Sequence, residues 1–369
     1  MPPNPRDARV VPNHQNQWTN KHENFTQSIE LYYDIWNPPP PVSDGFADLG
    51  LTVAKLQSLI GQAAQDNIRL RAYGGTWSLS HAAVTNGRLI NTKPLNWWFP
   101  LKSNFVSADY QGSQPGLVFA QCGISVGELN DHLLKRKSAL KTSGASNGQT
   151  IVGAVSTGTH GSAIEVGAMQ DFVVGMHIIV GPDRHIWLER SLYPVVSNEF
   201  LNRLGAELVR DDTLFDAAVV SFGSFGIIHA MLLETEPIYL LEASRLRMPI
   251  DNQLRQAMNT LDFTHLALHH QNEKPFHFEV VINPHDVDNG AYVTTMYKRP
   301  YRDDYTRPSP SQGGLAPGDD VLGVIGRVGD AVPASIPALV NTFVGQTYEE
   351  YQMKQGTLGE IFSWNTVHG

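Results

Sequence analysis

Residues 150–162 read TIVGAVSTGTHGS, and this segment carries the strongest functional signal in the 369-residue chain. It combines three threonines and three glycines with His160. Glycine lets a backbone come close to a ligand, and successive exposed N–H groups form a concave site for anions. Threonine and serine hydroxyls can donate further hydrogen bonds to phosphate oxygens. The segment therefore predicts a site for a phosphate-containing ligand.

Two further glycine-rich segments adjoin predicted strands. Apolar and polar residues alternate over 68–73, which is typical of a strand, and this strand leads into residues 74–78 (GGTWS). Farther along, residues 223–226 (GSFG) precede the apolar run 227–233, which predicts another strand. Residues 74–78, like residues 150–162, could bring backbone N–H groups close to a ligand.

Better-known phosphate and metal motifs are missing from the sequence. It has no G-x-x-x-x-G-K-[ST] loop and no G-x-G-x-x-G after a strand, which argues against a P-loop hydrolase and a standard Rossmann site. It also has no H-E-x-x-H pair, and its fourteen histidines are scattered. No metal site is therefore expected.

The composition indicates an acidic, folded protein, with 41% hydrophobic residues and a net charge of −9. This charge argues against nucleic acid or an anionic membrane as a partner. Cys122 is the single cysteine, so an intrachain disulfide is excluded and a small core residue is expected. No apolar stretch approaches the roughly 18 residues of a membrane span, and no targeting segment is visible. We expect a cytoplasmic protein without a membrane span.

The pattern of elements predicts an α+β fold with two domains. Residues 1–45 are polar and rich in proline, which indicates an N-terminal arm. A helix is expected after Thr52 as its N-cap, and another over residues 334–351. The character of the sequence changes near Pro237, so we place a domain boundary at about residue 240.

The three glycine-rich segments resemble, in order and spacing, the signatures of the vanillyl-alcohol oxidase (PCMH-type) flavoproteins, especially the aldonolactone and alditol oxidase branch. Residues 74–78 match G-x-G-H-S, residues 152–161 match G-G-A-x-x-T-G-T-H-G, and residues 223–228 match G-x-x-G-[IV]-[IV]. The resemblance covers about residues 15–240. It implies a PCMH-type FAD-binding domain over 46–240, with subdomains of about 46–105 and 106–240.

The resemblance also implies which residues contact FAD. The cofactor would lie extended between the two subdomains, with its pyrophosphate in the first two segments and the ring of His160 near the flavin edge. The implied cofactor-binding residues are Gly74, Gly75, Thr76, Trp77, Ser78, Ala145, Thr150, Gly153, Thr157, Gly158, Thr159, His160, Ile227 and Ile228.

Trp77 departs from the family pattern. Many relatives have a histidine at this position that is bonded covalently to the flavin ring. Indole has no ring nitrogen as nucleophilic as that of imidazole, so we expect non-covalent FAD. An attachment shifted to His81, four residues later, is the alternative.

Residues 241–369 are expected to form a small or incomplete α+β substrate domain. Alternation over residues 277–283 puts His277 and Glu279 on one face of a strand. The resemblance implies that this domain carries the catalytic base, and Glu279 or His277 could take a proton from a hydroxyl group. A solvent-exposed sheet face is the other interpretation. Lys298 and Arg299 could neutralise an alkoxide or could lie at the solvated surface.

The resemblance implies an FAD-dependent oxidoreductase that oxidises a CH–OH group. The substrate would be a small alcohol (a polyol, a sugar lactone or a sterol-like alcohol), and oxygen or another acceptor would reoxidise the flavin. Relatives generally continue further and carry an H-x-G-K-like stretch that this chain lacks. A flavin-binding protein with little or no turnover is therefore the alternative, and a third interpretation is that the segments bind another phosphate ligand.

Overall fold

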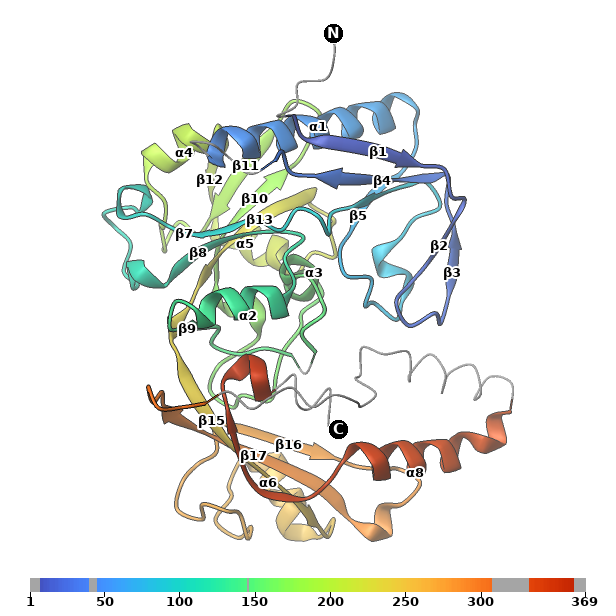
Figure 1. The fold of residues 1–369 in the computed structure, drawn as a ribbon, viewed down its shortest axis with the longest axis vertical. Coiled ribbons are helices and arrows are strands. Elements are labelled where there is room, and N and C mark those ends of the chain that lie inside the picture. Colours follow the sequence, from blue (N-terminus) through green and yellow to red (C-terminus); the bar gives the residue numbers. More distant parts are fainter. Residues whose placement is uncertain (1–6, 40–44, 145, 307–331, 362–369) are drawn as a thin grey trace. The chain divides into compact units, whose positions relative to one another are not determined.

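The structure is a computed structural model that describes residues 7–39, 45–144, 146–306 and 332–361. The chain divides into two compact units (Figure 1). The first unit comprises residues 1–129, 148–159 and 168–236, and the second comprises residues 130–147, 160–167 and 237–369. Residues 130–147 and 160–167, which are interior segments of the sequence, thus belong to the same unit as residues 237–369.

A four-stranded sheet of the first unit has the order β1-β4-β6-β5. β1 (Arg9–Asn13) and β4 (Leu31–Trp36) are antiparallel, while β6 (Arg88–Asn91) and β5 (Leu70–Tyr73) continue the sheet in parallel. β2 (Gln17–Thr19) and β3 (Thr26–Ser28) form a hairpin between β1 and β4. The structure thus differs from the arm expected over residues 1–45, because β4 is stabilised by strands on both sides.

The second sheet of this unit has six strands in the order β12-β11-β10-β13-β8-β7. Its central strands β10, β13 and β8 are buried nearly throughout, as a strand covered on both faces must be. The strands are β7 (Trp98–Pro100), β8 (Leu117–Gln121), β10 (Val173–Ile179), β11 (His185–Glu189), β12 (Glu207–Arg210) and β13 (Ile227–Glu234).

α1 (Gly45–Gln65) joins these two sheets through a shared core. Its residues Val53 and Leu56 pack with Ile35 and Ile90 of the four-stranded sheet and with Ile179 of the six-stranded sheet. Thr52 is not the N-cap that the sequence predicts. It is fully buried inside the helix, and its hydroxyl hydrogen-bonds to the Asp48 carbonyl oxygen one turn earlier at 3.5 Å.

The shorter helices begin at side chains that cap them. Ser125 and Glu128 form the expected capping box, because Ser125 N–H donates to the Glu128 carboxylate at 2.7 Å and Glu128 N–H donates to Ser125 Oγ at 3.2 Å. Asp211 caps the last of these helices through Leu214 N–H at 2.8 Å. The helices are α2 (Val126–Leu134), α3 (Ile151–Ser156), α4 (Asn198–Leu204) and α5 (Asp212–Val219).

The second unit contains an antiparallel sheet in the order β16-β17-β15-β18. One face of this sheet packs its apolar side chains, among them Phe278 and Val293, against α6 (Asn252–Thr260). The helix expected over residues 334–351 is shorter, because α8 (Ile336–Thr347) ends before a strand. The strands are β15 (Tyr239–Met248), β16 (His277–Val281), β17 (Ala291–Pro300) and β18 (Tyr351–Gly356). A further two-residue pairing joins β9 (Ser138–Ala139) to β14 (Glu236–Pro237).

Candidate cofactor site

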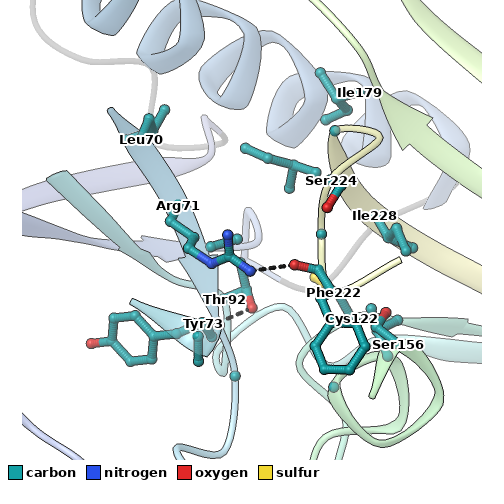
Figure 2. A pocket seen from close by; sticks show the side chains of 18 of the residues that line it. Leu70, Arg71, Tyr73, Thr92, Cys122, Ser156, Ile179, Phe222, Ser224 and Ile228 are labelled. Carbon is teal, nitrogen blue, oxygen red and sulfur yellow. Dashed lines mark hydrogen bonds between the residues drawn. The ribbon is translucent and has the colours of Figure 1, made fainter. Parts of the chain in front are cut away.

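A cavity of about 480 Å³ lies within the first unit, a size typical of cofactor pockets (Figure 2). Its walls come from α1, β5, α3, the residues before β13, and the ends of β10 and β13. Apolar side chains such as Ile60, Val152 and Ile179 line it together with the polar groups of Arg71 and Ser224. Such a mixture suits a ligand with an apolar ring system and a charged chain.

The first two glycine-rich segments meet at Thr150. Thr150 caps α3, since its Oγ1 accepts a hydrogen bond from Gly153 N–H at 3.3 Å. A Cβ on Gly74 would overlap the Thr150 hydroxyl, so only glycine allows this close approach. Residues 151–156 form the short helix α3, whereas the sequence predicted a loop. This helix lines the cavity.

The third segment turns sharply before it enters β13. Phe222, Gly223 and Gly226 all have positive φ, and Gly226 has φ +129°. A Cβ on Gly226 would overlap the Ile179 carbonyl oxygen of the neighbouring strand β10. This contact explains why the segment has glycine at the point where it joins the sheet.

Arg71 connects opposite walls of the cavity. Its guanidinium projects from β5 and donates a hydrogen bond to the Phe222 carbonyl oxygen, as Figure 2 shows. Burial lowers the pKa of Arg71 from its ordinary value, but a guanidinium keeps its charge at neutral pH. The cavity therefore has one fixed positive charge on its wall, which would attract an anionic group.

The Ser156 hydroxyl and the Cys122 thiol are two buried groups on the cavity wall. The Ser156 hydroxyl is buried without a hydrogen-bond partner among the described residues. A buried hydroxyl of this kind costs free energy unless a ligand satisfies it. Cys122 is a buried wall residue, as expected for a small core side chain, and burial raises the pKa of its thiol to about 12. The thiol is thus neutral at physiological pH.

Half of the residues predicted to bind the cofactor lie on the cavity wall. These seven residues are Gly74, Ser78, Thr150, Gly153, Thr157, Ile227 and Ile228. Gly75, Thr76, Trp77, Gly158 and Thr159 belong to the same unit but are not wall residues. His160 is exposed and belongs to the second unit, with its Nδ1 3.2 Å from the Gly161 carbonyl oxygen. Ala145 lies outside the described residues.

Trp77 occupies a defined place away from the wall. Its indole packs on Gly148, where a Cβ would overlap it, and meets the His22 ring edge-on at 5.4 Å. Lys21 Nζ lies 5.0 Å from the centre of the Trp77 ring. Thr76, just before it, has a left-handed backbone with φ +61°. The family motif quoted above has glycine at this position.

Several wall residues were not identified from the sequence. Arg71 and Tyr73 alternate with apolar residues in β5, so their pattern indicated only a strand. Thr92 and Ser156 are single hydroxyl residues whose surroundings form only when distant segments meet. Gly223 and Gly226 belong to the third family motif, so the sequence contained a signal for them. Only Ile227 and Ile228 of this motif were predicted to bind the cofactor.

The two predicted catalytic residues lie in the second unit. His277 is fully buried, its Nδ1 is 3.0 Å from Ser162 Oγ, and burial together with the Lys298 charge lowers its pKa to about 4. Burial raises the pKa of Glu279, while the charge of Arg245 opposes this shift. Both are on the face of β16 opposite to the apolar residues that pack on α6. They are not a solvent-exposed sheet face.

Lys298 and Arg299 have partners of their own within the second unit. Arg299 forms ion pairs with Glu273, with nitrogen–oxygen distances of 2.6 and 2.9 Å. Lys298 Nζ lies 4.0 Å from the centre of the Tyr239 ring. Glu242 and His270 are in contact, and Glu242, His269 and His270 are grouped closely enough to hold a cation.

Comparison with known proteins finds a match within the N-terminal half of the chain. Residues 51–188 match the family model of the FAD binding domain. This part of the chain is therefore similar to FAD-binding domains. A solved structure of cholesterol oxidase from Brevibacterium sterolicum superposes on this structure with a TM-score of 0.60 over 98% of the chain and 63% of that protein, at 12% identity. The likeness confirms the expected α+β fold with a PCMH-type domain.

Curated relatives of the chain include enzymes whose names give lactones as substrates. An L-gulono-1,4-lactone dehydrogenase from Mycobacterium tuberculosis is 25% identical over 258 residues, which cover 70% of this chain and 49% of that protein. An L-gulonolactone oxidase from Mus musculus is 25% identical over 296 residues, or 80% of this chain and 53% of that protein. The chain spans about half the length of these relatives.

The residues of the cavity fit FAD. The positive charge of Arg71 and the Ser156 hydroxyl, which has no partner among the described residues, offer donors for a pyrophosphate or a ribose. Gly74 and Gly226 stand where a side chain would not fit. Within the described residues, no helix is long and apolar enough to cross a membrane.

Proposed function

We propose that this protein is an FAD-dependent oxidoreductase that oxidises a CH–OH group of a small alcohol. The observation that carries the proposal is the cavity wall, where residues of all three family motifs converge around Arg71 and the unpartnered Ser156 hydroxyl. The lactone oxidases and dehydrogenases among its relatives support this reaction class. Residues 46–240 would form the cofactor domain and residues 241–369 the substrate domain.

The residues of the chain would divide the work with the cofactor. When bound, FAD supplies the acceptor for the hydride that leaves the substrate carbon. Arg71 and the Ser156 hydroxyl would hold its anionic chain, with Ser78 and Thr157 on the wall beside it, while Ile227 and Ile228 would pack on its apolar parts. With Trp77 at the position of the family's attachment histidine, the cofactor would be bound without a covalent link. Gly75, Thr76, Gly158, Thr159 and His160 would support the cofactor from beyond the wall.

Glu279 is the favoured proton acceptor, with His277 as the second candidate. As hydride leaves the carbon, the hydroxyl proton must pass to a base, which gives the carbonyl product. A carboxylate whose pKa burial has raised is a stronger base than an exposed one. The low pKa of His277 keeps its imidazole neutral at pH 7, but it also makes that imidazole a weak base.

The surroundings of Glu279 favour a small polar substrate. Thr294 and Arg245 lie on the same face of the sheet, and both are buried. A sheet face that carries polar and charged groups suits a polyol or a sugar lactone, whereas a sterol needs a largely apolar surface. We therefore favour polyols and sugar lactones, with oxygen or another carrier accepting the electrons afterwards.

A flavin spectrum and a substrate panel test the proposal. The purified protein, supplied with FAD, should show visible flavin bands, and anaerobic addition of a lactone or polyol should bleach them. Glu279→Gln should keep the bands and slow bleaching by about 10² to 10⁴-fold, the usual contribution of a general base. Glu165→Gln, which changes an exposed carboxylate paired with Lys274, is the matched control.

Each alternative has its own outcome. Flavin bands that no lactone, polyol or sterol bleaches would support a flavin-binding protein without turnover. A protein that shows no flavin bands even with FAD supplied would contradict the proposal and favour another phosphate ligand.

A further inference from the structure

Four side chains from four different strands form a row across the sheet of the second unit. Glu279 of β16 is opposite Thr294 of β17, Thr294 is opposite Arg245 of β15, and Arg245 is opposite Tyr351 of β18. Directly opposed residues of an antiparallel sheet point to the same face. The row therefore lies on the face that carries Glu279, opposite to the face covered by α6.

Arg245 is held rigidly within this row. It is only 2% exposed, and its Nε donates a hydrogen bond to Thr294 Oγ1 at 2.9 Å. Its guanidinium carbon lies 4.9 Å from the centre of the Tyr348 ring and 5.2 Å from that of Tyr351. Aromatic faces stabilise a cation in a place from which water is excluded. The charge is thus fixed in position and weakly screened.

The groups around Glu279 respond to this charge. Burial raises the pKa of Glu279, and the Arg245 charge acts in the opposite direction. Burial also raises the pKa values of Tyr348 and Tyr351, so both rings are neutral at pH 7. Lys354 of β18 stacks on Tyr351 at 4.4 Å, and burial and the Arg245 charge lower its pKa.

We propose that Arg245 is a positioning residue that keeps the carboxylate of Glu279 charged and in place on the sheet, ready to accept the substrate's hydroxyl proton. The inference rests on the proposed function of Glu279 as the base. A buried carboxylate without a neighbouring cation takes up a proton, and a protonated carboxyl group is no base. His277, two residues away on the same face of β16, is neutral and cannot supply the missing charge.

The test compares removal of the charge with its retention. Arg245→Met removes the cation and should move the acid limb of the kcat/KM profile to higher pH, because the Arg245 charge lowers the pKa of Glu279. Activity should fall on the acid side of the profile and recover at higher pH. Arg245→Lys keeps a cation and should restore most of this activity.

A second readout needs no flavin chemistry. In protein labelled with ¹³C at the glutamate carboxyl carbons, the Glu279 signal is assigned by its loss in Glu279→Gln and titrated directly. It should titrate at higher pH in Arg245→Met than in the unaltered protein. Arg247→Met is the matched control, because Arg247 lies two residues along β15 on the same face and stacks on Tyr292. Neither its acid limb nor its Glu279 titration should move.

The outcomes separate the inference from the proposed function. If Glu279→Gln is inactive but Arg245→Met changes neither the acid limb nor the Glu279 titration, Arg245 has no such role. If Glu279→Gln is as active as the unaltered protein, the proposed base is wrong. If Arg245→Met fails to fold, Thr294→Val is the substitute variant, because it removes the 2.9 Å hydrogen bond to Arg245 Nε. The acid limb and the Glu279 titration should then both move to higher pH, by a smaller amount than in Arg245→Met. If neither moves, the inference is wrong.

Discussion

The Nδ1 atoms of His177 and His229 lie 3.0 Å apart in the interior of the six-stranded sheet, where both side chains are fully buried. Two ring nitrogens at this distance share one proton, so one ring donates and the other accepts. Nε2 of His177 lies 2.8 Å from Nδ1 of the partly exposed His185. In the other direction, Nε2 of His229 lies 3.1 Å from Nε2 of Gln121. The three rings therefore form a continuous chain.

Gln121 sets the direction of the protons in this chain. Its Oε1 accepts the backbone N–H of Trp97 at 2.9 Å, so its Nε2 is the donor toward His229. His229 must then donate from Nδ1 to His177, and His177 must donate from Nε2 to His185. All three rings are satisfied in the neutral form, and an added proton would place two N–H donors against each other.

The histidine chain should make the protein unstable in acid. Burial and the neighbouring histidines lower the pKa of His177, and the same causes lower that of His229 to about 3. In the unfolded chain both pKa values are about 6.5. The unfolded state therefore binds protons first, and the free energy of unfolding should decrease as pH falls from about 6.5 toward 3. The expected slope is about 1.4 kcal/mol per pH unit for each histidine, measured by urea unfolding at pH 7, 6, 5 and 4.

A variant of one histidine checks the origin of this slope. His229→Gln removes one titrating group and should reduce the slope by about 1.4 kcal/mol per pH unit. His14→Gln, which changes an exposed histidine, should leave it unaltered. Equal slopes in His229→Gln and the unaltered protein would show that the acid sensitivity has another source.

Thr76→Gly should stabilise the protein. A β-branched residue at φ +61° is strained by about 1–2 kcal/mol, and glycine relieves this strain at a smaller cost in unfolded-state entropy. We expect the free energy of unfolding to rise by about 0.5–1 kcal/mol, measured by urea denaturation. Thr76→Val keeps the β-branch and should bring no gain. A destabilised Thr76→Gly protein would mean that contacts of the threonine side chain outweigh its strain.

Gly226→Ala should weaken FAD binding about tenfold or more. The new Cβ would overlap the Ile179 carbonyl oxygen, and the residue has φ +129°, so the turn on the cavity wall must move. Fluorescence titration with FAD measures the effect. Gly205→Ala is the matched control, because Gly205 has φ +70° but open space around it, away from the cavity. Its cost should be limited to stability, at about 1 kcal/mol. Equal FAD affinities in both variants would contradict this account.

Arg71→Met should also weaken FAD binding, by about 10- to 100-fold. It removes the fixed charge on the cavity wall and the hydrogen bond to Phe222, and a hydrogen bond to a charged group contributes about 1.5–3 kcal/mol. Arg71→Lys should have an intermediate effect because it keeps the charge. Arg69→Met, two residues earlier and exposed, should bind FAD normally. An unchanged affinity in Arg71→Met would exclude Arg71 from the cofactor site.

Denaturation should release the flavin from the polypeptide. Trp77 cannot form the histidyl link of the family, so acid precipitation should leave the yellow colour in the supernatant. His81→Ala should behave identically. Colour that stays with the precipitated protein, and is lost in His81→Ala, would instead identify His81 as a shifted attachment site.

Structural elements whose sequence signals lie in neighbouring residues were predicted well. The strands predicted over residues 68–73 and 227–233 depend on side chains a few positions apart, so their patterns are complete in the sequence. The FAD-binding segments are contiguous motifs for the same reason. Seven of their residues lie on one cavity wall.

Elements stabilised by distant partners were missed. β4 lies within the polar, proline-rich first 45 residues, which indicated an arm, and its pairing with β1 and β6 stabilises it as a strand. Residues 151–156 looked like a loop because glycine and serine are poor helix formers, yet the Thr150 cap and tertiary packing stabilise α3. Burial overruled local propensity in α3, whereas β4 was missed because of the polar, proline-rich sequence around it.

The sequence by itself determined the cofactor class, the non-covalent expectation at Trp77 and Glu279 as a candidate base, because each depends on which residue stands at one position. Only the tertiary structure decided that Arg71 reaches Phe222, that His177 meets His229, and that Glu279 shares a row with Arg245. Sheet register and chain crossing bring these residues together from positions 34 to 151 residues apart. The charges and protons they share exist only in that folded arrangement, where low exposure to water makes them strong.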